Sequence, residues 1–257
     1  MSKKVKSIIS IVLFIIIIIC LTKIIDKNYK YYKADKTYED IRNIKINSLN
    51  AEENGESIQV EKLKGINSDY KLWINIPNTV IDYPVVQGKD NEFYLENNFY
   101  NEPSIAGTIF LDYGNDVLND KNLILYGHNM RNGSMFADIN KFKEKEFFDN
   151  GIIKINKDSK EYVYEIFSVF IESGNNINLK NSFMSDEEFN EYVNNLKEKS
   201  MYDTGVEVNS DDEVLILQTC STHKDYSNYQ RKYLKLLICH VLVSAKEKKY
   251  TWRVDGY

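Results

Sequence analysis

The stretch VLILQTC, residues 214–220, decides the fold of this chain and points to its chemistry. Four consecutive aliphatic residues stand between acidic residues before them and polar residues after them, and this pattern predicts a short buried strand. Cys220 ends the strand, so the sheet would hold its backbone while the sulfur faces a cleft. A thiol placed in this way is a candidate nucleophile.

A second predicted strand ends on a histidine. In LILYGHNM, residues 123–130, an apolar run leads to Gly127 and His128, and a turn-rich polar segment follows. A free thiol with a pKa of about 8.5 is only a few per cent thiolate at neutral pH, so it needs a nearby base or cation. An imidazole with a pKa of about 6.5 can supply the base and later protonate a leaving amine. The two strand ends therefore predict a thiol–imidazole pair.

The remaining histidines and cysteines have simpler interpretations. His223 lies in the polar loop after Cys220 and is expected to face solvent, and His240 is expected to be an ordinary strand residue. Cys239 reads as a small core residue, and Cys20 lies in an apolar N-terminal run. The sequence has no disulfide framework and no CxxC metal spacing, so we expect no metal and no cofactor.

The composition bounds the class of protein. The chain has 257 residues, 43% of them hydrophobic and 28% charged, with a net charge of −5. No basic stripe offsets the acidic excess, which argues against a nucleic-acid partner. The 3 prolines and 11 glycines argue against a long disordered linker. One folded domain of ordinary size is expected.

The N-terminal region predicts a membrane anchor. Residues 8–25 are almost entirely aliphatic or aromatic, and as a helix these 18 residues would span about 27 Å, close to the roughly 30 Å hydrocarbon core. Three lysines precede them, which favours a cytoplasmic segment 1–7 and an extracellular remainder. A cleaved signal peptide is the alternative, but no A-x-A-like site follows the apolar run.

The rest of the chain divides into a stalk and a domain. Residues 26–62 are rich in charged residues and tyrosine, and are interpreted as an extracellular, partly helical stalk or a solvated spacer. The domain is expected over residues 63–257. Many short strands with few helices predict a mainly β barrel or sandwich. Strands are expected at residues 70–76, 80–86, 107–111, 122–126, 151–155, 161–171, 214–219 and 233–244, and helices at residues 91–98, 134–148 and 185–199.

A cation near the thiol would complete the site. The tetrahedral intermediate of acyl transfer needs a donor for its oxyanion, and a guanidinium stays charged and offers several N–H groups. Arg231 begins the strand after Cys220, and a neighbouring strand would bring it back towards the thiol. A surface charge at a strand end is an equally good interpretation of Arg231.

Several motifs resemble those of class B sortases. YGHNM at residues 126–130, followed by NGSMF at residues 132–136, looks like the histidine motif of that class. LQTC at residues 217–220 resembles its TLxTC cysteine strand, with Ile216 where threonine is usual. Residues 85–99 and 106–112 also resemble the class, and the similarity covers roughly residues 63–244.

The resemblance implies a closed sortase barrel of about eight strands, a few peripheral helices and an N-terminal helical anchor or stalk. It implies a cysteine transpeptidase with Cys220 as nucleophile, His128 as acid and base, and Arg231 as the oxyanion or substrate-orienting cation. Lys235 is the alternative, and would take this place if the family arginine aligns with the clean aliphatic run that follows it. Two-residue alternation puts Arg231 and Lys235 on one strand face and so cannot separate them. The substrate-binding residues implied are Asn91, Leu95, Gln218 and Thr219, with Gln218 standing where the class often has serine, and a further segment around residues 171–201.

The expected activity is cleavage of an NPxTx-like C-terminal sorting signal and transfer of the secreted protein to a peptidoglycan precursor amine. The enzyme would lie in the cell membrane with one span and an extracellular catalytic domain. Two other functions stay open: a membrane-anchored cysteine protease, since the order His then Cys also occurs in caspase-like enzymes, and a non-catalytic surface module.

Overall fold

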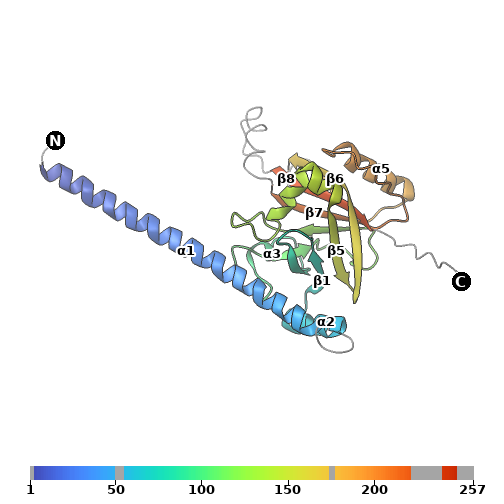
Figure 1. The fold of residues 1–257 in the computed structure, drawn as a ribbon, viewed down its shortest axis with the longest axis horizontal. Coiled ribbons are helices and arrows are strands. Elements are labelled where there is room, and N and C mark those ends of the chain that lie inside the picture. Colours follow the sequence, from blue (N-terminus) through green and yellow to red (C-terminus); the bar gives the residue numbers. More distant parts are fainter. Residues whose placement is uncertain (1–2, 50–54, 174–176, 221–238, 248–257) are drawn as a thin grey trace.

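The computed structural model describes residues 3–49, 55–173, 177–220 and 239–247. Within these residues, eight strands close into a barrel in the order β1-β2-β3-β4-β7-β8-β6-β5. Helix α1 extends away from the barrel (Figure 1). The predicted mainly β fold is therefore confirmed as a closed barrel, with helices at its periphery and one long N-terminal helix.

The strands are β1 (Tyr70–Asn75), β2 (Asp82–Val86), β3 (Ile109–Leu111), β4 (Asn122–Tyr126), β5 (Ile152–Lys157), β6 (Lys160–Ser173), β7 (Val214–Cys220) and β8 (Cys239–Glu247). The helices are α1 (Lys3–Leu49), α2 (Gly55–Ile66), α3 (Phe93–Glu96), α4 (Lys145–Asn150), α5 (Asp186–Glu198) and the 3-10 helix η1 (Ala137–Lys143). Neighbouring strands are antiparallel except for β2 with β3 and β4 with β7, which are parallel.

Strand β7 is apolar on both faces because both of its faces are covered. Leu215 and Leu217 point into the barrel core, whereas Val214 and Ile216 belong to a second cluster on the outside. Helix α5 supplies the cover with three buried side chains, Phe189, Val193 and Leu196. A strand buried on both sides reads as a continuous apolar run, and residues 214–217 show this pattern.

Helix α5 begins where the sequence predicts. The Ser185 hydroxyl accepts a hydrogen bond of 3.3 Å from the Glu188 N–H, and acidic residues fill the first turn. This is the N-cap arrangement that satisfies an otherwise unpaired helix donor. The helix predicted over residues 185–199 is therefore confirmed.

The single helix predicted over residues 134–148 is wrong. The chain forms η1 and then α4, and Glu144 between them has extended backbone angles. The Lys143 carbonyl accepts a hydrogen bond of 2.6 Å from the Tyr202 hydroxyl, so a tertiary contact uses an acceptor that a continuous helix would need. The sequence gives no local sign of this contact.

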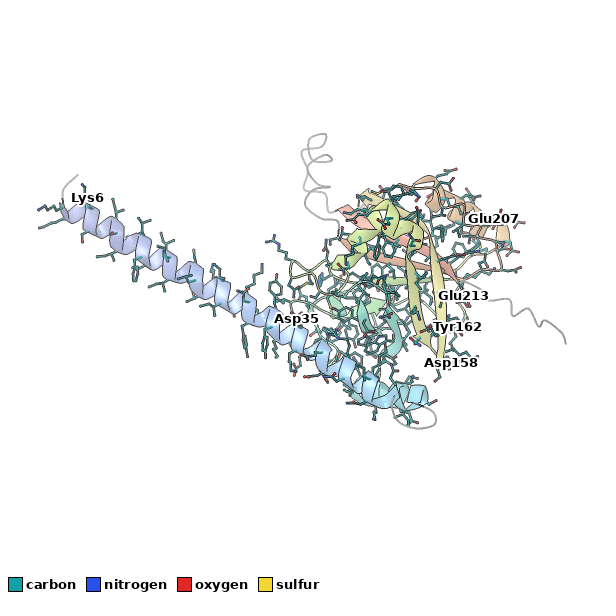
Figure 2. All side chains as sticks on the ribbon, viewed as in Figure 1. Lys6, Asp35, Asp158, Tyr162, Glu207 and Glu213 are labelled. Carbon is teal, nitrogen blue, oxygen red and sulfur yellow. The ribbon has the colours of Figure 1, made fainter. Side chains whose placement is uncertain are left out.

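Helix α1 has two parts with different surroundings. Its N-terminal half, which includes Lys6, projects away from the barrel with its side chains exposed, and the helix reaches the body of the protein near Asp35 (Figure 2). Its C-terminal half buries Ala34, Tyr38 and Ile41, spaced as one helix face, against the barrel core. Among the described residues, α1 is the one helix that is long and apolar enough to cross a membrane. A signal sequence near an N-terminus can have the same length and composition.

Two neighbouring residues of β5 offer a matched test of the barrel. Ile155 is fully buried, whereas Lys154 makes a part-exposed ion pair with Glu161 at 3.0 Å. We expect Ile155→Ala to lower the free energy of unfolding by roughly 2–5 kcal/mol, and Lys154→Ala to lower it by less than about 1 kcal/mol. Trp73 of β1 lies opposite Asn156 of β5. Urea unfolding followed by tryptophan fluorescence would measure the stability of both variants. Equal midpoints would contradict this packing.

Candidate active site

The predicted nucleophile and base stand at the same level of adjacent parallel strands. Tyr126 of β4 lies opposite Gln218 of β7, so His128 and Cys220, each two residues further on, follow at the same barrel edge. Neighbouring strands lie about 4.8 Å apart. On β7, two-residue alternation gives Cys220 the same face as Ile216 and Gln218, which is the outer face of the barrel. The structure therefore places the two residues at neighbouring strand ends.

Polar bonds fix these strand ends beyond the regular pairing. The Gly127 N–H donates to the Gln218 carbonyl at 3.2 Å, and the Thr219 hydroxyl donates to the Gly127 carbonyl at 2.7 Å. The side-chain amide of Asn129 donates to the Cys220 carbonyl at 2.8 Å. A Cβ at position 127 would lie 2.7 Å from the Phe136 ring, so glycine is needed there. The residues around His128 thus hold the register in which it meets Cys220.

The thiol of Cys220 is half-buried and forms no disulfide. It is neither sealed inside the barrel nor freely exposed. Burial raises the pKa of the Cys220 thiol, because desolvation disfavours the thiolate. This direction favours the neutral thiol, and a neutral thiol that acts as a nucleophile must give its proton to a base.

The imidazole of His128 is partly exposed and held by a backbone carbonyl. Its Nε2 lies 2.8 Å from the Leu95 carbonyl oxygen. A carbonyl can only accept, so Nε2 carries a proton, and in the neutral form of the ring Nδ1 is the acceptor. The Phe136 N–H also donates to the His128 carbonyl at 2.9 Å, which fixes the backbone that carries the ring.

Asn91 and Leu95 lie on the segment beside this pair. The Asn91 side chain donates to the Asp112 carboxylate at 2.7 Å and accepts from the Tyr113 N–H at 3.0 Å. Asp112 also accepts a hydrogen bond of 2.9 Å from the Tyr126 hydroxyl. Burial, and then the Asp112 carboxylate, raise the pKa of Tyr126 well above its usual range, so that hydroxyl stays a donor.

Two contributions were missed from the sequence. Asp112 links Asn91 to Tyr126 of β4. Its place in a segment that resembles the family was the only indication of this role in the sequence. The Leu95 carbonyl is a backbone group, so the residue type at position 95 does not predict its contact with His128.

The two substrate-binding residues predicted on β7 have different surroundings. Gln218 is partly exposed on the face shared with Cys220. Thr219 is 2% exposed, and its hydroxyl is bonded to Gly127. Its side chain therefore lies behind the site and ties the two strands together. Arg231 and Lys235, together with His223, lie outside the described residues.

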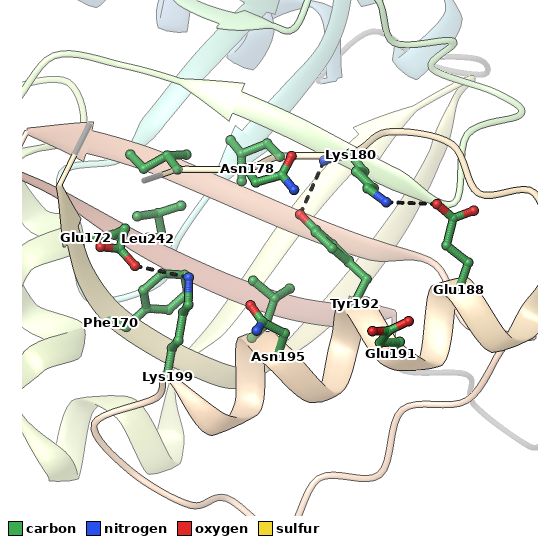
Figure 3. A pocket seen from close by; sticks show the side chains of 13 residues that line it. Phe170, Glu172, Asn178, Lys180, Glu188, Glu191, Tyr192, Asn195, Lys199 and Leu242 are labelled. Carbon is green, nitrogen blue, oxygen red and sulfur yellow. Dashed lines mark hydrogen bonds and ion pairs between the residues drawn. The ribbon is translucent and has the colours of Figure 1, made fainter. Parts of the chain in front are cut away.

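The segment before α5 crosses the outer face of the barrel (Figure 3). The Lys180 ammonium pairs with Glu188 at 2.8 Å, and the Lys180 N–H donates to the Tyr192 hydroxyl at 3.4 Å. These contacts fasten residues 177–180 to α5 above a pocket of about 250 Å³, whose walls include Phe170 and Leu242. Neither Cys220 nor His128 lines this pocket.

A larger cleft opens beside His128. It has a volume of about 640 Å³ and lies between α1 and residues 95–105. Its walls include Lys30 and Lys33 from α1, Leu95 and Glu96 from α3, and His128. Within the described parts of the chain, no group of three His, Cys, Asp or Glu side chains is arranged to hold a metal ion.

Comparison with known proteins gives the family. The Sortase domain family matches residues 74–236. Sortase B of Listeria monocytogenes is 38% identical over 170 residues, which cover 65% of this chain and 69% of that protein. A mutant form of Clostridium perfringens sortase B is 34% identical, with a TM-score of 0.73, and covers 84% of this chain and 98% of that one. A Staphylococcus aureus sortase B–substrate complex is 26% identical, with a TM-score of 0.75, and the match covers 86% of this chain and 99% of that one.

The family match begins within β1 and runs through β7, so it includes both strand ends described above. The chain belongs to the sortase family, and within that family to class B. It is a cysteine transpeptidase of the kind that sorts proteins to the cell wall.

The raised pKa of Cys220 has a measurable consequence. We expect the rate of Cys220 alkylation by iodoacetamide to rise with pH and to reach half its maximum at a higher pH than in an unstructured peptide with the same residues 214–224, because burial disfavours the thiolate. Mass spectrometry of the Cys220 peptide separates it from the other cysteines. A half-maximum at lower pH than in the peptide would contradict a neutral resting thiol.

Proposed function

We propose that this enzyme cleaves an NPxTx-like C-terminal sorting signal through a thioester acyl-enzyme and transfers the secreted protein to an amine of a cell-wall precursor. One observation carries the proposal: His128 and Cys220 stand side by side at the ends of two parallel strands in a bonded register. That arrangement is the nucleophile and base of covalent acyl transfer.

In the acylation step, the sulfur of Cys220 attacks the carbonyl carbon of the threonine in the signal. The thiol proton passes to Nδ1 of His128, which is the free acceptor because Nε2 is held by Leu95. The tetrahedral intermediate collapses, the carbon–nitrogen bond breaks, and His128 returns the proton to the leaving amine. The product is a thioester between Cys220 and the signal.

The second step reverses these roles. The acceptor amine attacks the thioester, and His128 takes its proton. The carbon–sulfur bond breaks, and the thiolate of Cys220 recovers the proton from the imidazole. An amide bond joins the secreted protein to the precursor, so the number of amide bonds is unchanged and no energy source is consumed.

The oxyanion formed in both steps needs a fixed donor. Arg231 is our candidate, because a guanidinium stays charged and presents its N–H groups in a rigid fork. Lys235 is the alternative. Asn91, Leu95 and Gln218 would contact the signal, and Thr219 would support their strand from behind.

The N-terminal region has a role in the same proposal. Residues 1–7 would be cytoplasmic, 8–25 would span the membrane, 26–62 would form the stalk, and 63–257 would be the extracellular catalytic domain. One membrane would then hold the enzyme, its tethered substrate and the lipid-linked precursor, which raises their effective concentration.

Product analysis with sorting-signal peptides tests the reaction. With hydroxylamine or a glycine peptide present, we expect transpeptidation products in place of hydrolysis products, because an amine intercepts the thioester. Cys220→Ala should reduce turnover by at least about 10³-fold, whereas Cys20→Ala, the matched control in α1, should retain it. Mass spectrometry identifies the products. Hydrolysis that no amine can divert would favour the cysteine protease, and Cys220 alkylation unaffected by His128→Ala would favour a non-catalytic module.

The oxyanion assignment has its own pair of variants. Arg231→Ala should lower kcat by about 10²–10³-fold, the usual loss when one oxyanion donor is removed. Lys235→Ala should change kcat by no more than a few fold. Steady-state kinetics with the preferred peptide measures both, and the reverse pattern would transfer the role to Lys235.

A further inference from the structure

The C-terminal half of α1 reaches the segment that holds the catalytic histidine. Tyr38 is 2% exposed and lies on the buried face of α1. Its hydroxyl donates to the Gly107 carbonyl and lies 3.0 Å from Oγ1 of Thr108. Burial raises the pKa of Tyr38 far above its usual value, so the hydroxyl keeps its proton and remains a donor.

Gly107 and Thr108 in turn contact helix α3 and the residue after it. Gly107 has a positive φ of 57°, and a Cβ on it would lie 2.5 Å from the Tyr94 carbonyl oxygen and 2.6 Å from that of Leu95. The Thr108 N–H donates to the Tyr94 carbonyl at 2.9 Å, and its hydroxyl donates to the Asn97 carbonyl at 2.9 Å. The backbone that bears Leu95 is therefore enclosed by residues 107 and 108.

The Leu95 carbonyl is the group that binds His128. Helix α3 has four residues, and the carbonyls at a helix end lack partners further along the chain. The Leu95 carbonyl finds its partner in Nε2 of His128 at 2.8 Å. Contacts thus run without a gap from Tyr38 through Gly107 to Leu95 and the imidazole.

We propose that Tyr38 is a positioning residue for His128, acting from the N-terminal helix through Gly107 and the Leu95 carbonyl. It keeps Nε2 as the protonated nitrogen and leaves Nδ1 to exchange protons with Cys220. The proposal rests on the proposed function in one respect, the role of His128 as acid and base.

The same helix supports the other flank of His128. The Asp35 carboxylate accepts hydrogen bonds of 3.2 Å at both oxygens from the Asn132 amide. The Tyr38 ring packs edge-on against Tyr83 at 5.3 Å, and the Tyr83 hydroxyl accepts a hydrogen bond of 3.2 Å from the Met135 N–H. Asn132 and Met135 belong to the turn between His128 and Phe136. Helix α1 therefore contacts both segments that orient the ring.

The test compares Tyr38→Phe with Tyr164→Phe in the full chain in detergent micelles. Tyr164 is also a fully buried tyrosine, and its hydroxyl is 3.4 Å from Glu213, next to the start of β7 and at the opposite end of that strand from Cys220. Each variant loses one buried hydroxyl, which has two partners in Tyr38 and one in Tyr164, and urea unfolding of both measures the difference in stability. Only Tyr38 is connected to His128.

Two readouts separate positioning from stability. In protein labelled with ¹⁵N-histidine, the chain's 3 histidines give few signals, and loss of one set in His128→Asn assigns those of His128. Wild type and Tyr164→Phe should show His128 protonated at Nε2, and Tyr38→Phe should show a mixture of the two tautomers. With sorting-signal peptide, Tyr38→Phe should lower kcat roughly tenfold through misplacement of the ring. KM should change by less than kcat, because the proposed peptide contacts of Asn91 and Gln218 are untouched.

An unchanged tautomer in Tyr38→Phe overturns the proposal, and so does an equal loss of kcat in both variants. If Tyr38→Phe does not fold, Thr108→Val against Thr108→Ser makes the same test, because only serine keeps the hydroxyl that binds the Asn97 carbonyl. The tautomer measurement needs no substrate. A shifted tautomer in Tyr38→Phe, with no peptide turned over by wild type, would uphold the positioning path and reject the proposed function.

Discussion

The parallel pairing of β4 with β7 in one register is the constraint on which the active site depends. An apolar strand covered on both faces cannot specify its own register, because Val214 to Leu217 would bury aliphatic side chains equally well after a slip of one residue. Such a slip would turn Cys220 to the barrel interior. The polar bonds at the strand ends prevent it: Thr219 to Gly127, and Asn129 to Cys220. Thr219 and Asn129, next to the proposed catalytic residues, therefore hold the two strands in register.

The sequence predicts the parts of this molecule that are locally encoded. The run before Cys220 marks a buried strand, and Ser185 marks the start of α5, because each depends on neighbours in the chain. The helix expected over residues 134–148 fails since Tyr202, more than fifty residues away, binds the Lys143 carbonyl. The Leu95 carbonyl could not be predicted at all, because every residue has a carbonyl and only the folded backbone selects this one.

The chemistry proposed for the site follows from the burial of its sulfur. Burial raises the pKa of the Cys220 thiol, which favours the neutral form, and a backbone carbonyl binds Nε2 of His128. A neutral thiol is less reactive than a thiolate towards oxidants and stray electrophiles. For an enzyme proposed to work outside the cell, activation delayed until a substrate carbonyl is in place protects the sulfur between turnovers.

Continuity of α1 links the proposed anchor to this chemistry. Tyr38 follows Ile25, the last residue of the apolar run, by 13 positions of one unbroken helix, which corresponds to a rise of about 20 Å. A flexible spacer of that length would hold the enzyme near a membrane but leave its orientation free. A helix that packs Ala34, Tyr38 and Ile41 into the barrel instead fixes the height and direction of the active site relative to the anchor. The substrate and acceptor proposed here are both tethered to the same surface, so a fixed site height restricts which parts of each can reach Cys220. In this proposal, helix α1 would set the height of the active site above the membrane as well as anchor the enzyme there.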